Sequence, residues 1–244
     1  MFNALRRPCL KSQADNRYGI AAQLFHRFGP SRCEFHSLFF AILLAFTPPA
    51  LAQAAEPVRL MLYGDSLLAG YGLAEEQAFE AQLEGALAEN GYEVEIINAS
   101  VSGDTTAGGV SRLDWALGDR PDAVVLALGG NDILRAIDPA STRQNLTAMM
   151  ERFDAEGIPV LLAGMRAPTS LGPEYQAAFD PIYPELALEY EAEYYPFLLD
   201  GVAGDRSLNQ NDGIHPNQAG AKEMVTRMLP VIQTLLDGLD GRES

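Results

Sequence analysis

The chain has 244 residues, of which 48% are hydrophobic, and its 33 acidic side chains outnumber the 17 basic ones to give a net charge of −16. Such an acidic protein repels phosphate groups, so neither nucleic acid nor an anionic membrane surface is expected as a partner. Both cysteines and two of the three histidines lie within the first 36 residues. The remainder has one histidine and no thiol, which disfavours a zinc site and favours chemistry with neither metal nor cofactor.

Residues 1–52 have the pattern of a signal peptide. The segment is basic at first, continues with an apolar run over residues 38–46, and ends in small residues before a cleavage position after Ala52. The apolar run is shorter than the roughly 20 residues that cross a bilayer, although a leader that stays attached as an anchor is the alternative. We therefore expect an exported protein, periplasmic or secreted, with no stable membrane anchor.

Residues 53–244 form the mature part in this interpretation, and their number suits a single domain. The leader holds six basic and two acidic residues of the 17 and 33, so its removal leaves 11 and 31 and takes the net charge to −20.

Short apolar runs alternate with stretches of helical period from residue 58 onward. Strands are predicted at Val58–Tyr63, Glu93–Asn98, Ala123–Leu128, Pro159–Ala163 and Tyr195–Leu199, and helices at Phe79–Asn90, Gly108–Leu117, Thr142–Glu156, Pro173–Glu193 and Gln218–Leu236. Buried strands separated by helices favour a parallel sheet that is covered on both faces. We expect an α/β fold, a three-layer α/β/α sandwich around a five-stranded parallel sheet.

Polar motifs follow four of the five predicted strands. Ser66 follows the first strand, Gly103 the second and Asn131 the third, while Asp212 and His215 follow the fifth and precede the last helix. Ligands bind beyond the carboxyl ends of the strands in open parallel sheets. These residues are therefore expected to meet at one edge of the sheet.

Ser66 is the candidate nucleophile, in the run Gly64-Asp65-Ser66 at the end of the first strand. Gly64 permits a sharp exit from the strand, which would leave the serine hydroxyl exposed. The alternative is an N-cap serine, which is common where a helix begins. Leu68 stands where the Gly-x-Ser-x-Gly elbow needs its second glycine, so the standard α/β-hydrolase signature is absent.

Asp212 and His215 offer the base that a serine nucleophile needs. An imidazole takes the serine proton, and a carboxylate on the other ring nitrogen fixes the tautomer and stabilises the imidazolium. The separation of three residues lets one short loop supply both groups. The alternative is a loop histidine that caps the final helix, and taken alone the motif favours neither.

Gly103 and Asn131 are candidate donors for an oxyanion hole, together with the backbone amide of Ser66. Acyl transfer builds negative charge on the carbonyl oxygen, and preorganised donors stabilise it. Gly103 brings a bare backbone N–H, and Asn131 follows two glycines. Tight turns, for which glycine and asparagine are typical, are the alternative for both segments.

Together these blocks resemble the SGNH (GDSL) hydrolases. The matching blocks are Gly64-Asp65-Ser66, the segment around Gly103, Gly129-Gly130-Asn131-Asp132 and Asp212-x-x-His215-Pro216, which occur in that family's order and spacing. The resemblance covers nearly the whole of residues 53–244. It is greatest to the periplasmic multifunctional group of thioesterase I, lysophospholipase L1 and arylesterase.

The resemblance implies a flavodoxin-like SGNH hydrolase fold and a role for each matching residue. Ser66 would be the nucleophile, His215 the general base and then the acid, and Asp212 its orienter. The oxyanion hole would combine the backbone amides of Ser66 and Gly103 with the side chain of Asn131.

Three further aspartates stand in these blocks. Asp65 is expected to hold the nucleophile turn, and Asp104 and Asp132 to make hydrogen bonds within loops rather than to catalyse.

Apolar residues beside the motifs are candidates to line a groove for an acyl or aryl group. They are Leu67, Leu134, Ile137, Met165 and Pro168, and ordinary packing is the alternative for each. The aromatic residues Trp115, Tyr190, Tyr194 and Tyr195 are interpreted as packing residues and not as a platform for sugar stacking.

The sequence thus predicts a serine esterase that hydrolyses small carboxylic esters or acyl thioesters through an acyl-enzyme. Two alternatives stay open. A carbohydrate O-acetylesterase would use the same side chains, and a catalytically silent binding protein would keep the same fold.

Overall fold

The computed structural model describes residues 56–240. The predicted leader over residues 1–52 lies outside them, so cleavage after Ala52 stays a prediction. Within the described residues, no helix is both long and apolar enough to cross a membrane.

Five strands form one sheet whose neighbours all run parallel, in the order β2-β1-β3-β4-β5. The strands are β1 (Val58–Gly64), β2 (Val94–Asn98), β3 (Ala123–Ala127), β4 (Val160–Ala163) and β5 (Glu193–Tyr195). This is the flavodoxin-like order, in which the switch point lies between β1 and β3. The expected α/β fold with a five-stranded parallel sheet is confirmed.

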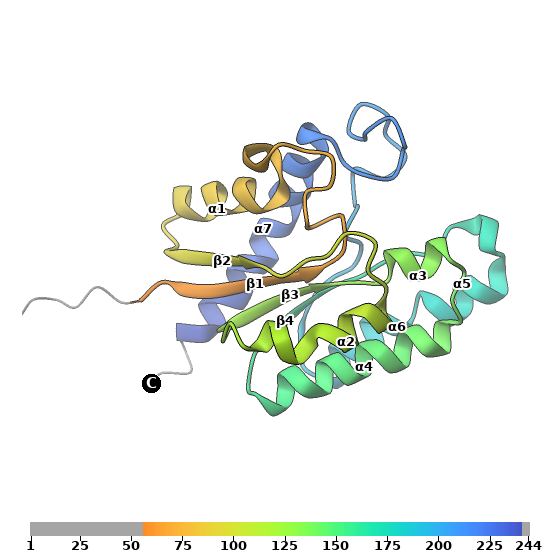
Figure 1. The fold of residues 1–244 in the computed structure, drawn as a ribbon, viewed down its shortest axis with the longest axis horizontal. Coiled ribbons are helices and arrows are strands. Elements are labelled where there is room, and N and C mark those ends of the chain that lie inside the picture. The colour runs from red at the N-terminus through yellow and green to blue at the C-terminus, as the bar shows by residue number, and fades with distance from the viewer. Residues whose placement is uncertain (1–55, 241–244) are drawn as a thin grey trace, which may run out of the picture. The chain divides into compact units, whose positions relative to one another are not determined.

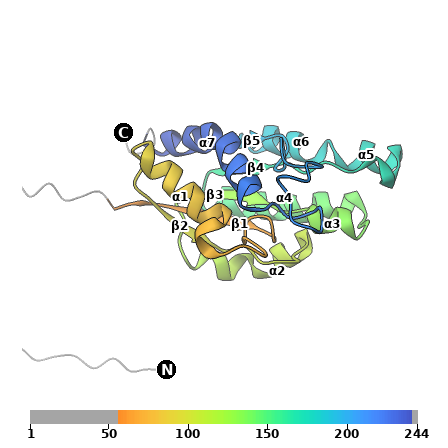
Figure 2. The same ribbon diagram turned by 90° about the horizontal axis from the view of Figure 1, so that it is seen from above.

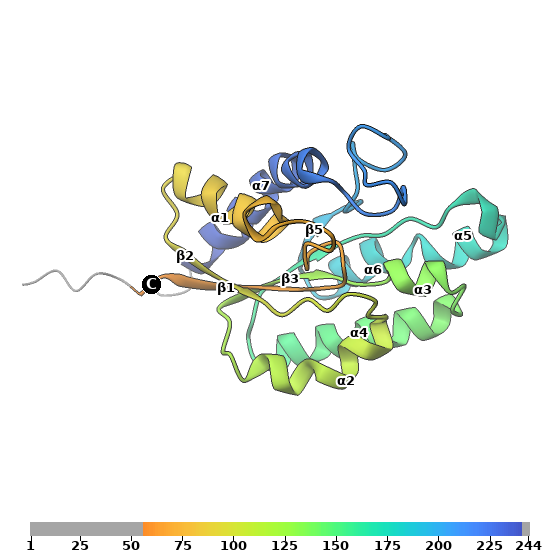
Figure 3. The same cartoon turned by 45° about the horizontal axis from the view of Figure 1, so that its top comes forward.

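Helices cover both faces of the sheet. They are α1 (Phe79–Glu89), α2 (Thr106–Leu117), α3 (Gly130–Leu134), α4 (Pro139–Ala155), α5 (Pro173–Phe179), α6 (Ile182–Glu189) and α7 (Gln218–Asp240), with 3-10 turns at Glu75–Gln77 and Thr169–Leu171. Helices α1 and α7 pack together on one face, and α2 and α4 pack together on the other (Figures 1 and 3). Figure 1 shows the sheet between these two layers, and Figure 2 views the same ribbon from above, from the side of α1 and α7.

The core lies on both sides of the central strands. All five residues of β3 are buried, and so are the last five of β1. Continuous burial is expected for strands that carry helices on both faces. The core aromatic side chains include Tyr63, Phe153 and Tyr183, of which Tyr63 and Phe153 meet edge to face. A rigid central sheet of this kind fixes the positions of the loops that follow its strands.

The predicted helix Pro173–Glu193 is wrong, because the structure divides it into α5 and α6. Pro181 lies at the break. Proline has no N–H for the helical ladder, and its ring clashes with the carbonyl four residues before it, so α5 does not continue into α6. Asp180 uses its side chain in the gap, where it accepts a hydrogen bond of 2.9 Å from the amide of Ala167.

The fifth strand also differs from its prediction at Tyr195–Leu199, because it covers Glu193–Tyr195. Pro196 cannot donate to the ladder and ends the pairing. The chain stays beside β4 for a further step, where the amide of Leu198 donates to the carbonyl of Gly164 at 2.9 Å. Phe197 and Leu199 therefore belong to a loop at the carboxyl edge rather than to a strand.

Trp115 was expected to pack in the core, and this expectation is wrong. Its side chain is 74% exposed on α2. The neighbouring Leu113 and Ala116 face the core instead, as the helical period requires. Of the three tyrosines, Tyr195 is buried, and Tyr190 and Tyr194 pack partly buried against the core.

Two helices begin before their predicted first residues because side chains cap them. Thr105 accepts a hydrogen bond from the amide of Gly108 and starts α2, and Asp138 accepts one from Ala140 and starts α4. Pro139 occupies the first turn of α4, where its missing N–H costs nothing. Helix α3 was not predicted, because its first residues match a glycine-rich turn.

Candidate active site

The loop after β1 carries Ser66, and its path depends on Gly64 and Asp65. A Cβ atom at Gly64 would lie 2.9 Å from the carbonyl oxygen of Ala127, so glycine lets β1 run close to β3 here. The buried carboxylate of Asp65 accepts a hydrogen bond of 3.1 Å from the amide of Leu67. Burial raises the pKa of Asp65 to about 6, while this hydrogen bond and one from Asn131 oppose the shift. The arrangement leaves Ser66 only partly covered at the end of the strand.

The loop before α7 carries Asp212 and His215. One carboxylate oxygen of Asp212 accepts hydrogen bonds from the amides of Ile214 at 2.9 Å and His215 at 3.0 Å. The other oxygen lies 2.7 Å from Nδ1 of His215. Hydrogen bonds from the His215 amide, the His215 ring and the Ile214 amide lower the pKa of Asp212 to about 2. Asp212 is therefore a carboxylate at every pH of practical interest.

Ser66 and His215 meet although 149 residues separate them. The distance from Nε2 of His215 to Oγ of Ser66 is 2.9 Å. Because Asp212 occupies the other ring nitrogen, it favours the tautomer with the proton on Nδ1, which leaves Nε2 free to accept a proton. The ring of Tyr71 lies against the imidazole, with 4.5 Å between the ring centroids. The two ends of the domain thus combine into one chain of hydrogen bonds.

Gly103 and Asn131 lie on the same edge, after β2 and β3. Gly103 has φ +84°, a left-handed conformation that favours glycine. Its carbonyl accepts a hydrogen bond of 2.8 Å from Arg135. Asn131 lies in the first turn of α3, and its side-chain amide donates to Asp65 at 3.3 Å.

The turn into α3 requires Gly129. Its φ is +116°, and a Cβ atom there would lie 2.0 Å from the hydroxyl of Tyr183. That hydroxyl donates to the carbonyl of Leu128 at 2.8 Å. The glycine therefore allows both the sharp turn and the close approach of Tyr183, and it places Asn131 beside the nucleophile loop.

Asp104 and Asp132 make structural hydrogen bonds or ion pairs near the site, as expected. Both, however, also contact residues outside their own loops. Asp132 is buried and accepts hydrogen bonds from the amide and hydroxyl of Thr106 and from the hydroxyl of Thr142. It thereby joins α3 to α2 and α4. Asp104 forms an ion pair with Arg112 of α2.

A cleft of about 420 Å³ opens beside these residues. Ser66, Gly103, Asn131 and His215 all line it. Further lining residues are apolar for the most part and include Leu67, Tyr71, Ile133, Leu134, Met165, Phe197, Leu199 and Ile214. The structure therefore brings together the predicted polar residues and an apolar surface.

Three of the candidate groove residues, Leu67, Leu134 and Met165, line this cleft. Pro168 and Ile137 do not line it. Pro168 is exposed at the start of the 3-10 turn Thr169–Leu171, and the carbonyl of Ile137 accepts a hydrogen bond from Tyr175. The chain turns away from the cleft after Arg166, which sequence spacing alone does not reveal.

Several lining residues were not foreseen from the sequence. Phe197 and Leu199 were assigned to a buried strand, and Pro196 was the signal that the strand ends before them. Ile214 stands inside the motif between Asp212 and His215. Tyr71 follows Gly70, whose positive φ of 71° turns the chain back toward the histidine.

Metal binding finds no support in side-chain clustering over residues 56–240. No group of three or more histidine, cysteine, aspartate or glutamate residues in this range is arranged to hold a metal ion.

A flavodoxin-like sheet with a serine, a histidine and an aspartate hydrogen-bonded in series at its carboxyl edge is the architecture of a hydrolase. The sequence profile of the GDSL-like Lipase/Acylhydrolase family matches residues 62–223. The chain belongs to this family, whose other established name is SGNH hydrolases, and it is a carboxylic ester hydrolase by class.

Curated relatives agree with this assignment. The chain is 41% identical over 187 residues to Esterase TesA of Pseudomonas aeruginosa, which covers 76% of this chain and 93% of the relative. It is 37% identical to the Arylesterase of Vibrio mimicus, over 72% of this chain and 88% of the relative. It is 35% identical to Thioesterase 1/protease 1/lysophospholipase L1 of Escherichia coli, over 81% and 91%.

Solved structures also match. The crystal structure of AlinE4, described as an SGNH-hydrolase family esterase, has a TM-score of 0.63 and 44% identity over 74% of this chain and 97% of its own. An acetyl xylan esterase has a TM-score of 0.61 at 21% identity, over 72% of this chain and 100% of its own, and this likeness shows the fold alone.

Proposed function

We propose that this protein hydrolyses small carboxylic esters and acyl thioesters through an acyl-enzyme on Ser66. The observation that carries the proposal is the continuous contact from Asp212 to His215 at 2.7 Å and from His215 to Ser66 at 2.9 Å. A serine hydroxyl is a weak nucleophile until a base takes its proton, and this arrangement provides an oriented base.

The first half of the reaction follows from these positions. Ser66 Oγ attacks the carbonyl carbon of the substrate while Nε2 of His215 takes the hydroxyl proton. Asp212 stabilises the imidazolium that results, because its carboxylate stays ionised. The imidazolium then returns the proton to the alcohol or thiol as it leaves, and the acyl group stays on Ser66.

The negative charge that forms on the carbonyl oxygen needs donors. We assign this role to the backbone amides of Ser66 and Gly103 and to the side chain of Asn131. All three residues line the cleft. The Asn131 amide has two hydrogens, and the bond to Asp65 engages one and leaves the other for the substrate. In the second half of the reaction, His215 activates water and the same donors stabilise the second tetrahedral intermediate.

The cleft favours apolar acyl or aryl groups. Its volume of about 420 Å³ is within the usual range for small ligands. Leu134 and Ile214 are exposed at its rim, and Leu67 and Met165 are buried in its wall. The names of the relatives, an esterase, an arylesterase and a thioesterase/lysophospholipase, support the same substrate class. An acetylated carbohydrate would leave most of this apolar surface uncovered.

A substrate panel tests the proposal. The purified protein is assayed with p-nitrophenyl esters of increasing chain length, with acyl-coenzyme A thioesters and with acetylated xylan, and Ser66→Ala serves as the control. We expect hydrolysis of the first two classes, and loss of nearly all of it in the control. Near-normal hydrolysis by Ser66→Ala would refute the acyl-enzyme. Selective activity on acetylated xylan would favour the carbohydrate esterase, and a folded protein inactive on all three would favour a silent binding protein.

Export to the periplasm or the medium is part of the proposal and depends on the leader pattern in residues 1–52. N-terminal sequencing of the exported protein tests it. We expect a mature chain that begins at about Gln53, and a different first residue would contradict the predicted cleavage position.

A further inference from the structure

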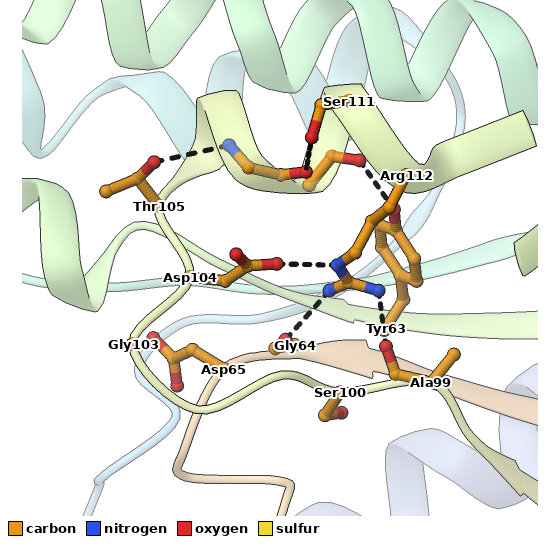
Figure 4. Close-up of polar contacts among 12 residues, drawn as sticks. Tyr63, Gly64, Asp65, Ala99, Ser100, Gly103, Asp104, Thr105, Ser111 and Arg112 are labelled. Carbon is orange, nitrogen blue, oxygen red and sulfur yellow. Dashed lines mark hydrogen bonds and ion pairs between the residues drawn. The ribbon is translucent and has the colours of Figure 1, made fainter. Parts of the chain in front are cut away.

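Arg112 makes three side-chain hydrogen bonds and a cation–π contact with Tyr63 next to the proposed catalytic residues. It lies on α2, with its side chain only 16% exposed, and it does not line the cleft. Nε donates to the Asp104 carboxylate at 2.5 Å, one terminal nitrogen donates to the Gly64 carbonyl at 3.1 Å, and the other donates to the Ala99 carbonyl. Figure 4 shows these three bonds fanning out from one guanidinium group.

The three acceptors lie at the end of β1 and in the loop after β2, next to the proposed backbone donors. Gly64 precedes Ser66 by two residues at the end of β1. Ala99 begins the loop after β2, and Asp104 is the neighbour of Gly103 in that loop. The distance between the amides of Ser66 and Gly103 therefore depends on how these two segments are held together, and Arg112 contacts both.

The surrounding residues make this contact rigid. The guanidinium carbon lies 4.1 Å from the centroid of the Tyr63 ring, and the Tyr63 hydroxyl donates to the carbonyl of Gly109 at 2.6 Å. A Cβ atom at Gly108 would lie 2.4 Å from a carboxylate oxygen of Asp104, so a glycine there gives Asp104 its space under α2. The helix, the strand and the loop are thus fixed around the guanidinium group.

We propose that Arg112 is a positioning residue for ester hydrolysis, which sets the spacing of the Ser66 and Gly103 amides and so preorganises the oxyanion hole. This inference rests on the proposed function. A planar guanidinium with a permanent charge can hold three acceptors in fixed directions, which the single ammonium of lysine cannot do. Donors that are held before the reaction cost no reorganisation when charge develops, and a displacement of 1 Å can lower the rate about 100-fold.

Three variants test the inference with one p-nitrophenyl ester, at a temperature well below their thermal midpoints. Arg112→Lys removes the fan of hydrogen bonds and keeps the charge. Asp104→Asn keeps an oxygen for Nε and removes the opposite charge. Arg143→Lys is the matched control, because Arg143 makes a surface ion pair with Glu185 on helices away from the cleft.

We expect Arg112→Lys to lower kcat by about 10- to 100-fold with KM changed less than about twofold, because the donors act on the transition state. Asp104→Asn should lower kcat by a smaller factor, about three- to tenfold, again with little change in KM. Arg143→Lys should match the wild type. A purely structural role would lower the thermal midpoint and leave kcat of the folded protein unchanged.

A kcat for both Arg112→Lys and Asp104→Asn that equals that of Arg143→Lys would overturn the inference. If Arg112→Lys does not fold, Asp104→Asn alone decides by the same criterion. The wild type and Ser66→Ala are assayed alongside. An inactive wild type or an active Ser66→Ala refutes the proposed function. If instead the wild type is active, Ser66→Ala is inactive, and Arg112→Lys and Asp104→Asn keep the kcat of the wild type, only the positioning role is refuted.

Discussion

Two pairs of a carboxylate and a basic side chain lie close to Ser66, and they differ in chemistry. Asp212 and His215 stand three residues apart on one open loop, and the Asp212 side chain is 39% exposed. Asp104 and Arg112 come from a loop and a helix, and their side chains are 19% and 16% exposed. Imidazole can gain and lose its proton near neutral pH, whereas guanidinium keeps its charge. The comparison teaches that a group that transfers a proton must titrate and must reach the substrate. A group that positions other residues works best when it keeps its charge and stays away from the substrate.

The largest expected effect comes from the pair that moves the proton. His215→Ala should lower kcat by about 10⁴-fold or more, because triad members act as a unit. Wild-type activity should also fall in acid, because a protonated His215 cannot accept the proton of Ser66. Asp212 does not contribute to that fall, because its pKa is about 2. Steady-state kinetics from pH 4 to 9 check both points, and a flat profile would contradict His215 as the base.

A smaller loss is expected at the oxyanion hole. Asn131→Ala should lower kcat by about 10²- to 10³-fold with KM nearly unchanged, because its amide acts when charge develops on the substrate. Asn90→Ala is a suitable control, since Asn90 caps α1 and its side-chain amide donates to the carbonyl of Ala86. The kcat values of the two variants on one ester give the comparison. A rise in KM alone would assign Asn131 to substrate binding instead.

The titration of Asp65 is expected to affect the free energy of unfolding rather than kcat. Its pKa is raised from 3.8 to about 6, so between these values the folded state holds a proton that the unfolded state has lost. The contribution of Asp65 to the free energy of unfolding should therefore decrease as the pH rises from about 4 to 6, by about 3 kcal/mol at 1.36 kcal/mol per unit of pKa. The penalty is fully present above the folded pKa of about 6 and fully relieved only below the unfolded pKa of 3.8.

Asp65→Asn carries no such titration. Urea unfolding of both proteins at several pH values isolates the effect as the difference in their free energies of unfolding. A difference that does not change between pH 4 and 7 would show that Asp65 is ionised in the fold throughout this range.

The smallest expected effect separates the cleft from the rest of the surface. Leu134 is 61% exposed on the cleft rim, and Leu188 is 83% exposed on α6 outside the cleft. Leu134→Ser should raise KM for a medium-chain ester about three- to fivefold, since a partly covered leucine contributes about 1 kcal/mol. Leu188→Ser should leave KM unchanged. Equal KM values for the two variants would place the acyl group elsewhere.

The fold and the polar part of the site were predictable because their signals are local or topological. Continuous apolar runs indicate parallel strands, and the carboxyl ends of such strands share one edge. This is sufficient to place Ser66, Gly103 and Asn131 near His215. The two wrong element bounds lie at prolines. The helical period continues across Pro181 and the apolar run continues across Pro196, although each proline interrupts the element.

The cleft and the Arg112 cluster were not predictable in the same way. Phe197 and Leu199 have the pattern of strand residues, but Pro196 ends the ladder before them. Pro168 has the position of a cleft residue, but the chain turns away from the cleft after Arg166. Arg112 lies in an ordinary amphipathic helix. Its acceptors are carbonyl groups of distant residues, which no sequence pattern displays.

The central claim is that Ser66 is the activated nucleophile, and covalent labelling tests it most directly. The purified protein is treated with a fluorophosphonate, digested and analysed by mass spectrometry, with Ser66→Ala and His215→Ala treated in parallel. We predict a single adduct on Ser66 that forms as hydrolysis is lost, that is absent from Ser66→Ala and that forms far more slowly in His215→Ala. Complete loss of hydrolysis with the label on another residue, or full hydrolysis after Ser66 has been labelled, would contradict the account.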